Sequence, residues 1–109
     1  MIDIETFSEE MDNDREVIKL ILTELISSID MQIPLMRKHL QNNEFTALSR
    51  EAHSIKGGCR NVMSEPLALA AENLEKTALN EISNDTLIAL KDLTTLFEQF
   101  KNFVNNNFI

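Results

Sequence analysis

Apolar residues recur along most of the chain at the spacing of one face of an α-helix, and the longest such stripe comes first. Its members are Ile18, Ile21, Leu22, Leu25, Ile29, Ile33, Met36 and Leu40. Asn13, with Glu16 three residues later, is typical of a capping box at a helix start. Pro34 lies inside the stripe and lacks an amide donor, so we expect a kink or a break there. The polar pair Asn42–Asn43 ends this helix and can cap the next.

Two further segments follow the same period. A second helix is expected from near Glu44 to about Asn61, and a short loop around Met63 and Ser64 leads to a third. Pro66 stands in the first turn of the third helix, where its missing N–H leaves no bond unmade. The apolar positions of these helices are Phe45, Leu48, Ala52, Ile55, Cys59 and Val62, then Leu67, Ala70, Ala71, Leu74 and Ala78.

A fourth long helix follows the polar turn at residues 80–85, with Ser83 or Asn84 as its cap. Its apolar face carries Leu90, Leu93, Phe97, Phe100 and Val104. The last five residues, Asn-rich, are expected to fray.

These elements predict an all-α protein, an antiparallel four-helix bundle with a short N-terminal helix. Ile4 and Phe7 indicate that short helix, which could cover one end of the bundle. The length of 109 residues suits one domain spanning residues 1–109.

Composition narrows both the fold and the function. With two Gly, two Pro and no Trp or Tyr, the chain lacks the turn and aromatic residues of a small β-sandwich or barrel. A formal net charge of −8 would repel phosphate backbones and anionic lipid, so nucleic acids and membrane surfaces are poor partners. The start of the chain is acidic and unlike a signal peptide, and no apolar run approaches the roughly 20 residues of a membrane span. A single cysteine, Cys59, on the apolar stripe, fits a reducing cytoplasm.

His53 lies away from the apolar stripe of the second helix. On a helical wheel, the residues within roughly 60° of it are Thr46, Ser49, Arg50, Lys56, Gly57 and Arg60. The wheel therefore places His53 in the middle of the solvent face, where a buried structural histidine would not stand. His39, by contrast, is interpreted as an ordinary helix-end residue.

The surroundings of His53 suit a nucleophile. Three cations, Arg50, Lys56 and Arg60, flank it, and positive charge favours the neutral, nucleophilic imidazole. The same cations would stabilise a dianionic group on the ring. Glycine costs about 1 kcal/mol in a helix interior, so the pair Gly57–Gly58 suggests that something approaches this surface closely.

The stretch AHSIKGG, from Ala52 to Gly58, resembles the AHxLKG signature of histidine phosphotransfer (HPt) domains. The resemblance covers nearly the whole chain. Its other matching positions are Leu35 to Leu40, Phe45 and Leu48 upstream, and Leu67 and the pair Leu74–Glu75 downstream. The sequence departs from the pattern at Met63, where the family usually has Gly closing the active helix.

The resemblance implies a phosphocarrier without independent turnover. His53 would be the phosphoacceptor, Lys56 the cation beside the phosphoryl group, and Gly57 the small residue that keeps the imidazole accessible. Arg60 is a further candidate phosphate-supporting cation. The implied partners are a response-regulator receiver domain and a hybrid sensor histidine kinase. The receiver would bring the Mg²⁺, so no metal or cofactor is expected on this domain. The domain is also expected to be a monomer.

Two alternatives remain from the residues themselves. The first is a four-helix interaction module that binds a receiver or kinase without accepting phosphate. The second, a kinase dimerisation domain, is disfavoured because Ser54, and not an acidic residue, follows the histidine. No Ser–His–Asp triad and no Gly-rich phosphate loop is present. Off the main stripe of the first helix, Leu20, Met31 and Leu35 either face a docking partner or pack against another helix.

Overall fold

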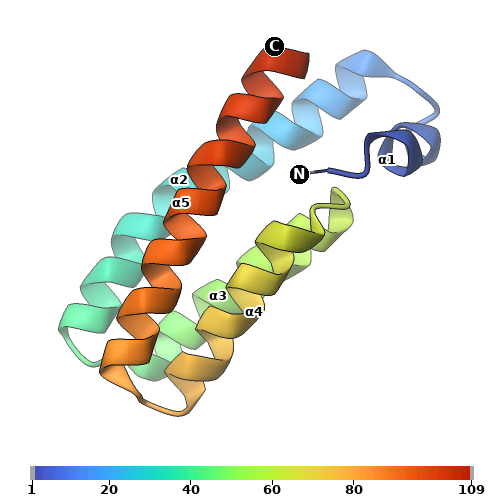
Figure 1. Ribbon diagram of the computed structural model, residues 1–109. Helices are drawn as coiled ribbons and strands as arrows, with labels where there is room; N and C mark the ends of the chain where they lie inside the picture. The colour runs from blue at the N-terminus through green and yellow to red at the C-terminus, as the bar shows by residue number, and fades with distance from the viewer. Residues whose placement is uncertain (1, 109) are drawn as a thin grey trace.

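The computed structural model describes residues 2–108, which form five helices and no strand. Figure 1 shows their arrangement. The helices are α1 (Ile4–Glu10), α2 (Arg15–Gln41), α3 (Phe45–Asn61), α4 (Glu65–Leu79) and α5 (Ser83–Phe108). The last four run antiparallel in a bundle in which each packs on two neighbours, in the cyclic order α2, α3, α4, α5. With α1, the described chain measures 43 × 19 × 18 Å. The predicted all-α bundle with a short N-terminal helix is confirmed.

The apolar stripes of the four long helices meet in a single core. The largest fully buried side chains of α2–α5 are Leu22, Ile29, Met36, Leu48, Ile55, Leu67, Leu74, Leu93, Phe97 and Phe100. Cys59 lies among them, as its place on the stripe predicts, and burial raises the pKa of its thiol to about 12. None of the helices within residues 2–108 is both long and apolar enough to cross a membrane.

Helix α1 covers the end of the bundle where α3 turns into α4 (Figure 1). The Asp3 amide donates to the Met63 carbonyl at 3.1 Å, and the Asp3 carboxylate caps α1 by accepting from the Thr6 amide. Phe7 is completely buried beneath α1. This helix therefore forms the predicted cover, held by one backbone hydrogen bond and one aromatic anchor.

The helix starts differ from the predicted caps. Asp14, and not Asn13, caps α2, because its carboxylate accepts from the amides of Glu16 and Val17. Asn13 is instead left-handed at φ 55°, and its amide bonds back to α1. Asn43 also has φ 55°, and α3 begins after Glu44 with no side-chain cap.

The start of α5 and the course of α2 differ from expectation as well. Ser83 is the first residue of α5, so neither Ser83 nor Asn84 is its cap. The carbonyl of Ile82 accepts from both the amide and the hydroxyl of Thr86. Helix α2 runs unbroken through Pro34, so a break there was the wrong alternative.

The predicted fraying of the C-terminal tail is wrong for residues 105–108, while Ile109 lies outside the described residues. Helix α5 continues to Phe108, which is buried and has its ring centroid 6.4 Å from that of Phe103. Arg15 donates to the carbonyl of Asn107 at 3.0 Å, satisfying a helix-terminal acceptor that would otherwise face water. Packing and this cap offset the weak helix propensity of the Asn run.

Helix α3 ends at Asn61 in a Schellman motif, although the position that favours Gly is occupied by Met63. Met63 is left-handed, with φ 60°. Its amide donates to the Arg60 carbonyl at 3.1 Å, and the Ser64 amide donates to the Cys59 carbonyl at 2.9 Å. The side chain of Met63 packs against the core, which offsets part of the strain of a left-handed non-glycine residue. The departure from the HPt pattern therefore leaves the helix end intact.

Substitution at Met63 separates strain from packing. Both Met63→Gly and Met63→Ala remove the side-chain contacts, but only Gly relieves the left-handed strain. We expect Met63→Gly to be more stable than Met63→Ala by about 1 kcal/mol, although Gly is ordinarily the less favourable residue. Urea denaturation of the two variants measures the difference. Equal stabilities would contradict the assignment of strain to this residue.

Candidate functional site

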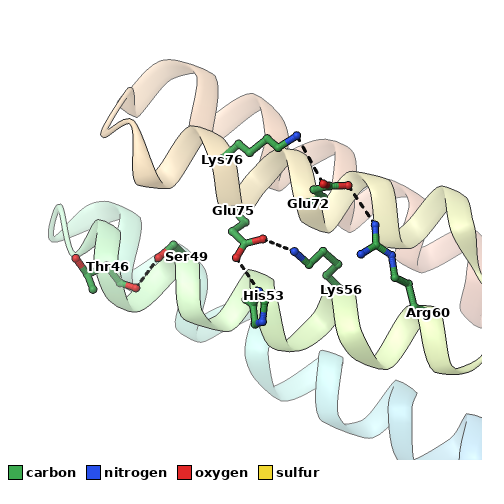
Figure 2. Close-up of polar contacts among 8 residues, drawn as sticks. All are labelled: Thr46, Ser49, His53, Lys56, Arg60, Glu72, Glu75 and Lys76. Atoms are coloured by element: carbon green, nitrogen blue, oxygen red, sulfur yellow. Dashed lines mark hydrogen bonds and ion pairs between the residues drawn. The ribbon is translucent and has the colours of Figure 1, made fainter.

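His53 stands at the middle of α3 with its side chain 67% exposed. Its neighbours Ala52 and Ile55 are buried in the core, so the helix turns His53 outward. The ring leans toward α4, the helix packed against α3 on this side (Figure 2). The exposed position predicted from the wheel is confirmed.

Glu75 of α4 joins the histidine to a lysine. Its Oε2 lies 2.8 Å from His53 Nδ1, and its Oε1 accepts from Lys56 Nζ at 2.7 Å (Figure 2). The side chains of Lys56 and Glu75 are only 16% and 17% exposed, so both are held in the seam between α3 and α4. Sequence reasoning gave Glu75 no role beyond its match to the family pattern.

The Glu75 carboxylate determines which nitrogen of His53 is free. The pKa of Glu75 is held below its ordinary value of 4.5, and the largest cause is the hydrogen bond from Lys56. Partial burial of the carboxylate raises this pKa, and the hydrogen bond from His53 lowers it further. An ionised carboxylate can only accept, so His53 Nδ1 donates. In the neutral ring, Nε2 then carries the lone pair, and no residue within 2–108 bonds to it.

The other cations near His53 differ from the expected flanking trio. Arg60 pairs with Glu72 at 3.3 Å, and Lys76 approaches the other oxygen of Glu72 at 3.6 Å. Arg50 forms no ion pair among the described residues. Acids of α4 therefore neutralise Lys56 and Arg60, which corrects the picture of three free cations around the ring.

Ser49 is also placed differently from the wheel. The helical wheel places Ser49 on the solvent face, but it is only 5% exposed because the seam with α4 covers that side of α3 (Figure 2). Its hydroxyl donates to the Thr46 carbonyl at 2.8 Å.

Among residues 2–108, no group of three or more His, Cys, Asp or Glu side chains is placed to hold a metal ion.

The two glycines of the chain serve different purposes. Both lie within α3, and neither has a positive φ. A Cβ on Gly57 would meet nothing within 4 Å, so this turn beside His53 presents bare backbone to solvent. A Cβ on Gly58 would lie 2.8 Å from Cδ1 of Leu25. The missing side chain of Gly58 therefore leaves room for Leu25 of α2, and not for an outside partner. The expected close approach therefore applies to Gly57 alone.

Three apolar side chains that lie off the main stripe of α2 face solvent and do not pack against another helix. Leu20, Met31 and Leu35 are 58%, 71% and 47% exposed. On α4, Leu79 stands one turn beyond Glu75 and is 63% exposed. Apolar side chains are thus available on the helices at both sides of α3.

The Glu75 contacts predict a pH dependence of stability. Because the folded pKa is below the unfolded one, the ionised carboxylate contributes its full stabilisation above about 4.5 and loses it as pH falls through the folded pKa. We expect Glu75→Gln to lower the free energy of unfolding at neutral pH. Below the folded pKa of Glu75, the free energies of unfolding of the variant and the wild type should be the same. Urea denaturation across this range measures the difference. Glu24→Gln, an exposed site outside the ion pairs of residues 2–108, is the control; an identical profile for both would contradict the role of Glu75.

Comparison with known proteins gives one match. A family model described as "Hpt domain" matches residues 4–103 of the chain. No curated protein and no solved structure matches. The matched range takes in α1, all of α2, α3 and α4, and most of α5.

Proposed function

This chain belongs to the Hpt domain family, the phosphocarrier modules of phosphorelay signalling, and we propose that His53 is its phosphoacceptor. In this proposal His53 takes a phosphoryl group from the aspartyl phosphate of one receiver domain and passes it to another. The observation that carries the proposal is the exposed His53 ring, oriented by Glu75 so that Nε2 is the free nitrogen.

The transfer step follows from that orientation. The Nε2 lone pair attacks phosphorus in line, the bond from phosphorus to the aspartyl oxygen breaks, and the electron pair leaves on the receiver's carboxylate. The ring now has both nitrogens substituted and carries a positive charge. Glu75 stabilises this charge through the Nδ1 hydrogen bond, so its carboxylate favours the phosphorylated product. Such a reaction depends on positioning and electrostatics, which a rigid helix pair supplies.

Lys56 is proposed as the cation beside the phosphoryl group. Its ammonium group is one helical turn from His53 and is already held by Glu75. Arg60 lies one turn further and is held by Glu72, so we assign it a weaker supporting role. The receiver is proposed to supply the Mg²⁺ and the aspartate, with no cofactor on this chain.

The docking surface is proposed to centre on the bare turn at Gly57. A receiver needs to approach within bonding distance of Nε2, and no atom outside this turn lies within 4 Å of the position that a Gly57 Cβ would take. Exposed Met31, Leu35 and Leu79 add apolar surface on the two flanking helices, on the side of His53 toward the start of α3. We assign as partners a response-regulator receiver and a hybrid sensor histidine kinase, in the cytoplasm, with residues 1–109 acting as one monomeric domain.

The alternative is an interaction module that binds a receiver without accepting phosphate. Incubation with a phosphorylated receiver distinguishes the two, because phosphohistidine is acid-labile and base-stable. The proposal predicts such a phosphate on this chain. Binding of the receiver without any transferred phosphate would favour the interaction module.

Replacing Lys56 tests its assigned role. We expect Lys56→Ala to slow transfer or to shorten the lifetime of the phosphohistidine by about tenfold, equivalent to ~1.4 kcal/mol, while receiver binding persists. The physical reason is that the phosphoryl dianion loses its nearest cation while the Glu75 carboxylate remains. Quench-flow transfer and hydrolysis assays measure this. Lys76→Ala, which removes an exposed cation of α4, is the control; wild-type behaviour of both variants would limit Lys56 to its ion pair with Glu75.

A further inference from the structure

A groove lies between α2 and α5, on the face of the bundle opposite α3 and α4. It consists of two hollows of about 490 Å³ and about 440 Å³ that share Leu40, Gln41 and Leu87. We call it the α2–α5 groove. Besides the shared residues, its lining includes Arg37, Leu90 and Lys91 at one end and the start of α5 at the other.

The floor of this groove is apolar and accessible. Leu87 is 41% exposed, Leu40 is partly buried against the core, and Leu90 lies beneath them at 3%. Along α5 the lining runs from Ser83 to Thr95, about 18 Å at 1.5 Å per residue. An open trough of that length would enclose a small molecule poorly, but it matches about three turns of helix.

The charge along the groove contrasts with that of the whole protein. The chain carries a net charge of −8, yet no acidic side chain lines either hollow. Arg37 and Lys91 both line it, and neither forms an ion pair among residues 2–108. In contrast, Lys56, Arg60 and Lys101 of the same chain are held by carboxylates. The groove therefore presents two uncompensated cations beside an apolar floor.

We propose that the α2–α5 groove binds an acidic amphipathic helix of a partner protein. Leucine-like side chains at i, i+3, i+4 and i+7 would cover Leu40 and Leu87, and carboxylates on the flanks would meet Arg37 and Lys91. The amide groups at the start of α5 add positive potential at the far end, and Asp85 of the same turn, outside the groove lining, offsets part of it. A second copy of this chain is a poorer occupant, because two molecules of charge −8 repel.

The position of the groove gives this contact a distinct purpose. Because α2 and α5 lie across the bundle from the His53–Glu75 seam, a helix seated there leaves Nε2 open. The protein could remain tethered to one partner while it exchanges phosphate with another. The tether goes beyond the proposed phosphotransfer, since groove binding does not require His53.

The test uses the full chain, labelled with ¹⁵N, and a synthetic helical peptide of about fourteen residues. The peptide places Leu at i, i+3, i+4 and i+7 and Glu on both flanks. We expect NMR shift changes around Arg37, Leu40 and Leu87, and an affinity that falls as salt is raised. A scrambled peptide of the same composition should not bind.

Matched variants locate the contact. Leu87→Glu and Lys91→Glu should each weaken binding at least about tenfold. Ile88→Glu and Lys38→Glu make the same changes at exposed positions outside the groove lining and should bind as the wild type does. Leu87→Glu should leave phosphate uptake from a receiver unchanged, so loss of groove binding and loss of phosphotransfer are distinguishable. The proposal is overturned if the peptide fails to bind, if shifts map elsewhere, or if Leu87→Glu instead disrupts a dimer of this chain.

Discussion

A His53→Gln variant is expected to accept no phosphoryl group from a receiver while its folding is almost unchanged. The side chain is 67% exposed, and substitutions at such positions usually change stability by no more than about 0.5 kcal/mol. Gln has no nucleophilic nitrogen, so the loss should be complete and should not reflect unfolding. The expected shift in melting temperature is within about 4 °C.

The assay compares phosphate uptake and thermal unfolding of the same preparations. His39→Gln is the matched control, since it removes the other histidine, which bonds to Glu44 near the end of α2. It should accept phosphate normally. Phosphate retained on His53→Gln would move the acceptor to another residue.

Substitutions at Gly57 should change stability and phosphotransfer in opposite directions. A Cβ there meets open space, so Gly57→Ala should raise the free energy of unfolding by up to about 1 kcal/mol through better helix propensity. Gly57→Gln should also fold. Both should slow phosphate uptake, Gln more than Ala, because the added side chain projects over the turn that a receiver must reach.

Gly58 supplies the contrast for that experiment. Its Cβ would press on Leu25, so Gly58→Ala should gain less stability than Gly57→Ala. Gly58→Gln should destabilise the fold by about 1–3 kcal/mol through overpacking. If Gly57→Gln unfolds the protein, or if it takes up phosphate at the wild-type rate, the docking surface is not over this turn.

The helices follow from the sequence because a 3.6-residue apolar period requires only local information. The helix caps do not, because several polar residues compete for each cap. At the α1–α2 turn, both Asn13 and Asp14 are good caps. Asn13 adopts the left-handed backbone conformation that follows α1, so Asp14 becomes the cap of α2. The ordered tail depends on Arg15, a residue remote in sequence.

The candidate site also combines one feature that the sequence predicts with one that it does not. The exposure of His53 can be predicted because it lies opposite the apolar stripe of α3, whereas the burial of Ser49 on the edge of the same face depends on the packing of α4. The pairing of His53 with Glu75 depends on the register between α3 and α4, which the apolar stripes leave open. A usable signal existed in the charges: Lys56 and Arg60 on α3 meet Glu75 and Glu72 on α4 in reverse order, as antiparallel helices require.

The most direct measurement is NMR of the protein with ¹⁵N-labelled histidine after phosphorylation by a receiver. The coupling between phosphorus and a ring nitrogen identifies the bonded atom. We predict a phosphoryl group on Nε2 of His53, with the proton retained on Nδ1 against Glu75. Phosphate on Nδ1 of His53, on His39, or on no histidine would contradict it.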